Sequence, residues 1–205
     1  MRMLLMLGNN SVKVIQEYVC FFKGVMMKHE DVVHKQHKVL ENLCKIPKRI
    51  LSLHGQKNMI EFVLHDLCHE YCFNLKKAAF FIDNPDFNCL KGIAGFSRDE
   101  SDKLVECDPV WEYPEQFSSC MKGLTFNNKV RDIYQCSVQK KHINHEIIVR
   151  DIAQQLDVAD PLFLSWPVKH GNHGLFVFEK ADKADACVDS YFSHGIALLG
   201  FCPIF

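Results

Sequence analysis

KAAFFI, residues 77–82, is the stretch that decides the fold of this chain, together with the DNPD that follows at 83–86. The first part is a short apolar run, and the second gathers residues that favour turns, so the two predict a β-strand and then a turn. A second apolar segment, Leu90 to Phe96, comes directly afterwards. The pair therefore predicts an antiparallel hairpin or meander in the middle of the chain.

Another pair of strands is predicted towards the C-terminus. Residues 162–168 are apolar but include Pro167, which favours an edge strand or a bulge because proline lacks the N–H that a sheet needs. Residues 170–174, HGNHG, tolerate positive φ angles and predict a turn. Residues 175–178, LFVF, then form the returning strand.

Helical periodicity precedes the first strand. Apolar residues at spacings of three and four predict helices over 11–27, over 30–46 and over about 56–75, with Pro47 ending the second of them. The apolar stripe of the second helix consists of Val32, Val33, Val39, Leu40, Leu43 and Ile46. Such amphipathic helices pair with each other or with a second copy of the chain.

The segment between the two strand pairs is less regular. Residues 99–107 predict a short helix, 109–114 a loop, 130–138 a strand and 143–156 a helix. A last helix is predicted over 181–199. Strands grouped between helices indicate an α+β fold, with an antiparallel sheet flanked by helices that lie on one face. We therefore expect an N-terminal helical arm over 1–50, which dimerises, and one α+β domain over 51–205.

Composition limits the classes of function. The 24 basic and 25 acidic side chains give a net charge of −1, so we expect no nucleic-acid partner, and the short basic cluster of Lys45, Lys48 and Arg49 is interpreted as a solvated helix end. No apolar run is long enough to span a membrane, so no membrane partner is expected. The 10 cysteines occur without a signal peptide, which favours free thiols in a reducing, cytoplasmic setting.

The order helix, hairpin, irregular middle, strand, turn, strand and helix resembles the GAF family of small-ligand sensors over about residues 56–200. The resemblance implies a GAF-like sheet and a non-enzymatic regulatory module that senses a small molecule or only dimerises. Bilin-binding members use a Cys-His pair, but Cys68-His69 lies on the helix before the first strand, which argues against a bilin. No cyclic-nucleotide signature is visible, and the cofactor stays open.

The ligand pocket of such a module is expected between the sheet and the irregular middle segment. Its predicted lining consists of Phe80, Ile93, Trp111, Phe117 and Trp166. The partner would be a small-molecule ligand or a protein, with a homodimer formed through the arm. The sequence contains no Walker loop, GxGxxG, GxSxG or CxxC motif, so nothing in it specifies a catalysed reaction.

One helix carries a possible set of metal ligands. His65, Cys68, His69 and Cys72 recur at spacings of three and four, which places them on one side of a helix, and these residue types are the usual ligands of zinc. One helix rarely supplies all four ligands of a tetrahedral site. The alternative interpretation is that the two cysteines pack in the core while the two histidines lie at its edge.

His65-Asp66 also resembles the metal-binding pair of the HD phosphohydrolases. The resemblance implies an earlier histidine, His34 or His37, and a later aspartate, Asp132 or Asp151, as further ligands. That family is all-helical, whereas strands are predicted soon after this pair. A metal-dependent hydrolase is therefore the alternative to the sensor.

Overall fold

The computed structural model describes residues 31–53, 58–107, 110–141, 144–181 and 189–203. The predicted helix over 11–27 lies outside this range. The first described element is a helix over residues 31–52. The elements that follow are α2 (Met59–Cys68), β1 (Leu75–Asn84), β2 (Cys89–Ser97), η1 (Arg98–Cys107), α3 (Pro114–Gly123), α4 (Thr125–Asp132), β3 (Tyr134–Gln135), α5 (Val138–Lys141), α6 (His145–Gln155), β4 (Leu162–Pro167), η2 (Lys169–Gly171), β5 (His173–Lys180), α7 (Asp189–Ala197) and η4 (Leu198–Phe201).

The strands form one five-stranded antiparallel sheet in the order β3-β2-β1-β5-β4. Both predicted strand pairs are therefore confirmed, as is the α+β class. β4 lies at the edge of the sheet, as Pro167 indicated. The turn before β5 has left-handed backbone at His170 (φ 62°) and Gly171 (φ 71°), which confirms the tolerance of positive φ predicted there.

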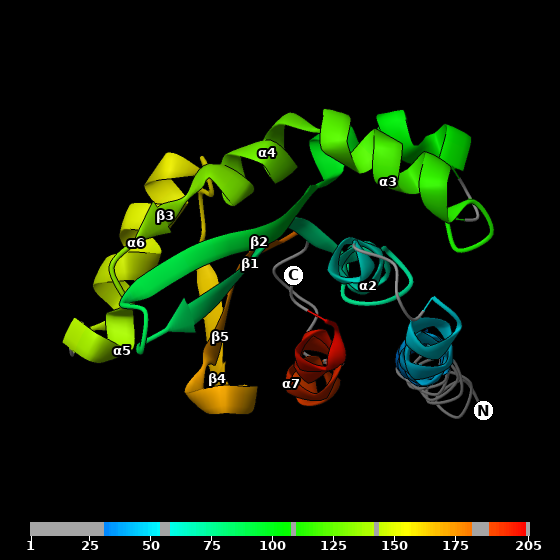
Figure 1. Cartoon of the computed structure of the whole chain (residues 1–205). Helices are drawn as coiled ribbons and strands as arrows, with labels where there is room; N and C mark the ends of the chain where they lie inside the picture. The colour runs from blue at the N-terminus through cyan, green and yellow to red at the C-terminus, as the bar shows by residue number, and fades with distance from the viewer. Residues whose placement is uncertain (1–30, 54–57, 108–109, 142–143, 182–188, 204–205) are drawn as a thin grey trace, which may run out of the picture.

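Helices cover both faces of the sheet, so the prediction that they lie on one face is wrong (Figure 1). The reason is visible in β1, where Phe80 packs into one core and Phe81 into the other, and both are fully buried. A strand that is buried on both sides has a continuous apolar run instead of alternation. KAAFFI is such a run.

The first core lies between the sheet, the helix 31–52, α2, α3 and α7. Val39 and Ile46 bring the helix 31–52 into this core with no exposed surface, and Phe62 does the same for α2. The helix runs through Pro47 to residue 52, so Pro47 does not end it. Proline leaves one carbonyl of the helix without its usual partner. Burial of Ile46 and Ile50 on either side of it favours continuation of the helix.

The second core lies under α4, α5 and α6, on the opposite face. Phe126 and Val130 of α4 rest directly on β2, where a Cβ on Gly92 would lie 1.8 Å from the backbone oxygen of Val130. Only glycine fits at this crossing. The strand predicted over 130–138 is reduced to two residues, because Val130 belongs to the helix α4 and Ile133 is the C-cap of that helix.

The helix predicted over 56–75 ends earlier, at Cys68. Asn74 has φ 51°, a left-handed conformation that reverses the chain so that Leu75 begins β1. The helix predicted over 143–156 is confirmed as α6, and the last helix is described over α7 and η4. None of the helices in the described ranges is long and apolar enough to cross a bilayer.

Candidate ligand cavity

A cavity of about 570 Å³ opens where the helix 31–52, α2, the end of β2 and η1 meet. This volume lies within the range of small-molecule sites in proteins. Its lining combines charged, polar and aromatic side chains, namely Asn42, Arg49, His65, Asp66, Cys68, His69, Glu70, Tyr71, Phe96, Arg98, Ser101, Leu104, Val110 and Trp111. The helix 31–52 therefore forms part of the wall.

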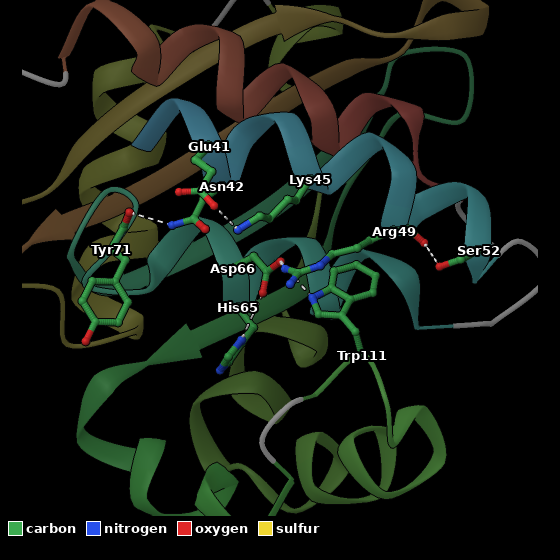
Figure 2. Close-up of polar contacts among 9 residues, drawn as sticks. All are labelled: Glu41, Asn42, Lys45, Arg49, Ser52, His65, Asp66, Tyr71 and Trp111. Atoms are coloured by element: carbon green, nitrogen blue, oxygen red, sulfur yellow. Dashed lines mark hydrogen bonds and ion pairs between the residues drawn. The ribbon is translucent and has the colours of Figure 1, made fainter. Parts of the chain in front are cut away.

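Asp66 is the centre of the polar contacts in this cavity (Figure 2). Its Oδ2 accepts a hydrogen bond of 2.5 Å from Nη1 of Arg49 and one of 2.8 Å from Nε1 of Trp111. The guanidinium of Arg49 also lies 5.3 Å from the centroid of the Trp111 ring. One carboxylate thus joins the helix 31–52, α2 and the segment before α3.

His65 carries a buried nitrogen without a partner. Its Nδ1 lies 3.6 Å from Oδ1 of Asp66, too far for a hydrogen bond, and no other described residue bonds to it. The ring meets Phe96 and Phe117 edge-on, with centroids 5.8 and 5.4 Å apart. Buried polar atoms normally find a partner, so this nitrogen is a candidate contact for a bound molecule.

Arg98 supplies positive charge at the junction of β2 and η1. Its Nη2 donates a hydrogen bond of 2.6 Å to Oδ1 of Asn74, a neutral group. Within the described part of the chain, no ion pair joins Arg98 to a carboxylate. Because Asp66 already pairs with Arg49, the guanidinium of Arg98 keeps its charge available to the cavity.

The four predicted metal ligands lie at and just beyond the C-terminal end of α2. Cys68 and Cys72 are buried in the first core, and burial raises the pKa of the Cys68 thiol well above its usual range and that of Cys72 to about 12. His65 and His69 lie at the edge, with ring centroids 6.1 Å apart. The described residues contain no group of three or more His, Cys, Asp or Glu side chains placed to hold a metal ion. Metal binding here stays a prediction.

The five predicted pocket residues all belong to or pack against the first core. Phe80 and Phe117 are fully buried inside it, and Phe80 stacks on Trp166 with ring centroids 5.7 Å apart. Ile93 is partly buried against the same core. Trp111 is the member of the five that lines the cavity. The ligand role of the others stays a prediction.

The residues that an HD-type site would need are spread over the molecule. His34 and His37 are exposed on the helix 31–52. Asp132 ends α4, and Asp151 belongs to α6, so both lie on the helices of the opposite face of the sheet from α2. Asp66 itself is engaged by Arg49 and Trp111.

The sequence prediction missed Arg49 and Arg98 as cavity residues. The sequence alone places Arg49 in a solvated basic cluster, whereas its partner Asp66 follows 17 residues later. Trp111 is a predicted pocket residue, but its contact with Asp66 spans 45 residues. No local spacing pattern reports such contacts, because the fold alone brings these segments together.

Comparison with protein-family models, with curated proteins and with solved structures finds no match for this chain. Fixed charges, one buried orphan nitrogen and an aromatic wall are features of a binding site for a small polar molecule.

Proposed function

We propose that this chain is a non-enzymatic regulatory module of GAF type, which binds a small molecule in the cavity around Asp66 and pairs with a second copy through the helix 31–52. One observation carries the proposal: the helix 31–52 contributes Asn42 and Arg49 to the cavity and also exposes an apolar stripe. A molecule bound in the cavity would thus touch the same helix that meets the partner.

The order of elements supports the GAF assignment. α2 leads into the β1–β2 hairpin, an irregular middle follows, and β4, a tight turn, β5 and α7 complete the domain. This order resembles that of the GAF family. The all-antiparallel sheet is consistent with it.

The helix 31–52 has two stripes of largely apolar side chains on different sides. The inner stripe packs into the first core and consists of Val39, Leu43, Ile46 and Ile50, and Leu53 packs there from just after the helix. The outer stripe is exposed and consists of Val33, His37, Leu40, Cys44, Pro47 and Leu51. Its members are spaced alternately by four and three residues, which is the pattern of the contact seam between paired helices. We call it the outer stripe below.

Exposure of the outer stripe favours a partner helix. The side chain of Leu51 is 74% exposed and that of Val33 is 50% exposed, so none of the described residues covers this apolar surface, and a partner helix would remove it from water. A second copy presents the same seam, so the two helices are self-complementary in a two-fold pair. Dimerisation through the arm follows from this pairing.

Light scattering on the full chain tests the dimer. We expect the wild-type protein to be a dimer and the double variant Val33→Glu, Leu40→Glu to be a monomer, because it places charges in the seam. Phe87→Glu is the matched control, since Phe87 is 79% exposed in the turn between β1 and β2. A monomeric wild type, or a double variant that stays dimeric, contradicts the proposal. Deleting the helix is unsuitable, because Val39 and Ile46 belong to the core.

A further inference from the structure

We infer that the cavity around Asp66 binds an aromatic carboxylate, with Arg98 as the group that binds the carboxylate of the ligand. This inference rests on the proposed function and names the class of molecule that the module senses. It depends on three features of the wall: the guanidinium of Arg98, which has no carboxylate partner among the described residues, a flat apolar surface, and the Nδ1 atom of His65, which has no hydrogen-bond partner there.

Arg98 gives one side of the cavity a preference for an anion. Arg49 and Asp66 neutralise each other, and the carboxylate of Glu70, which also lines the cavity, makes a side-chain hydrogen bond with Tyr71. Arg98 has the neutral Asn74 as its hydrogen-bond partner and no carboxylate within ion-pair distance among the described residues. The Arg98 side chain is half-buried, so its charge is less well hydrated than on an open surface. A guanidinium binds a carboxylate through two parallel hydrogen bonds, a geometry that no neutral amide reproduces.

The apolar part of the wall selects a flat body. Phe96, Leu104, Val110 and Trp111 line the cavity, and the hydrogen bond to Asp66 fixes the plane of the Trp111 ring. The Trp111 ring already has the Arg49 guanidinium 5.3 Å and the Phe62 ring 5.1 Å from its centroid, so it is held in one orientation. An aromatic ligand that packs against this fixed wall causes no further loss of side-chain entropy in the ring. A small aliphatic acid such as acetate would leave most of this surface uncovered.

The orphan nitrogen of His65 selects a polar substituent. Its Nδ1 is buried without a partner among the described residues and belongs to a side chain that lines the cavity. A hydroxyl on the aromatic ring would satisfy this nitrogen as either donor or acceptor. We therefore expect hydroxybenzoates to bind more tightly than benzoate.

Saturation-transfer NMR on the full chain tests the inference with three acids (benzoate, salicylate and para-hydroxybenzoate) and the corresponding amides. Each pair keeps the ring and changes the charge. We expect at least one acid to bind about tenfold more tightly than its amide, since a charged hydrogen bond to arginine is lost in the amide. No binding of any acid at millimolar concentration, or equal binding of acid and amide, overturns the inference.

Variants locate the binding group. Arg98→Gln should remove the preference for the acid, whereas Arg150→Gln, on the exposed side of α6, should retain it. Arg98→Lys keeps a positive charge, so it replaces Arg98→Gln as the test if that variant does not fold. We expect Arg98→Lys to bind the acid more tightly than the amide, but by a smaller factor than the wild type. An unchanged preference in both Arg98 variants overturns the inference.

The outcomes separate this inference from the proposed function. A wild-type dimer that binds none of the acids rejects the ligand class and leaves the dimer in place. A monomer that binds an acid with the Arg98 dependence rejects the dimer and keeps the ligand class.

Discussion

Oδ2 of Asp66 accepts the indole hydrogen of Trp111 over 2.8 Å, so a residue of α2 fixes an aromatic ring that lies 45 positions later in the chain. The same oxygen accepts a hydrogen bond from Arg49, whose guanidinium lies near the face of that ring. The three side chains form one unit at the cavity wall (Figure 2). Changing Asp66 therefore affects both of its partners.

Asp66→Ala should lower the free energy of unfolding by about 2 kcal/mol, because it leaves the Trp111 indole and the Arg49 guanidinium without their acceptor. Urea unfolding of the full chain measures this change. Tryptophan emission, recorded in a Trp166→Phe background, should shift as the Trp111 ring loses its fixed position. Asp86→Ala, in the exposed turn after β1, is the control and should change neither quantity. Equal stability of the two variants would contradict the role of Asp66 as the shared acceptor of Arg49 and Trp111.

Glu61→Gln should change how stability depends on pH. Burial raises the pKa of the Glu61 carboxyl, while hydrogen bonds from Asn127 and Arg131 oppose the shift. A carboxyl whose pKa is raised by folding stays protonated up to a higher pH in the folded state than in the unfolded state. The wild type therefore loses stability as pH rises from the ordinary value of 4.5 through the folded pKa.

The amide that Glu61→Gln introduces does not titrate, so the stability of the variant relative to the wild type should increase as pH rises through that window. Urea unfolding at a series of pH values from mildly acidic to neutral measures it. Glu115→Gln, on the exposed side of α3, should show a constant difference. A difference for Glu61→Gln that stays constant or falls with pH would disprove the raised pKa.

Gly92→Ala should destabilise the protein by about 3 kcal/mol or prevent folding, because overpacking here pushes against a backbone oxygen that cannot move aside. Gly123→Ala is the matched control at the end of α3, where a Cβ meets nothing within 4 Å. The control should be neutral or stabilising by about 0.5 kcal/mol, because alanine favours helix. Thermal unfolding of both variants measures the difference. Similar unfolding midpoints for Gly92→Ala and Gly123→Ala would contradict the close crossing of α4 and β2.

Oxidation should link two chains through Cys44. This cysteine is exposed on the outer stripe, and a parallel pairing of two helices places the two copies of Cys44 opposite each other. Non-reducing gel electrophoresis after mild oxidation should show a dimer that is lost in Cys44→Ser. Cys136→Ser removes the other exposed described cysteine and should keep the linked dimer. If Cys44→Ser still shows the dimer band, another cysteine links the two chains, and the result contradicts pairing through the outer stripe at Cys44.

The sequence was sufficient to predict β1, β2, β4 and β5 and insufficient to predict the helical layers on the two faces of the sheet. Residues 77–82 and 90–96 are apolar runs separated by turn residues, a local signal that the structure confirms as β1 and β2. The second helical layer was missed because an uninterrupted apolar strand was assigned one buried face. α4 was missed because Val130 near its end and Ile133 just after it favour strands locally, whereas in the structure Val130 packs on Gly92 of β2 as part of a helix.

The cavity was predicted in part. Trp111 was identified as a pocket residue, and His65 and Asp66 were recognised as an unusual pair. The contacts of Asp66 and Trp111 with Arg49 depend on how the helix 31–52 lies against α2, which is a tertiary feature without a sequence pattern. Arg98 was not predicted as a cavity residue for the same reason, because only the tertiary fold brings the end of β2, where Arg98 lies, to the cavity.

Phe80 and Phe81 are adjacent in the chain but belong to different cores, and β1 is hydrogen-bonded to β2 on one edge and to β5 on the other. No partial opening can expose the amides of this strand without separating a neighbouring strand and disturbing both helical layers. Exchange of these amide hydrogens with solvent water therefore requires the entire domain to open. We therefore expect the two layers to unfold as one cooperative unit, with β1 as the segment whose amide hydrogens exchange most slowly.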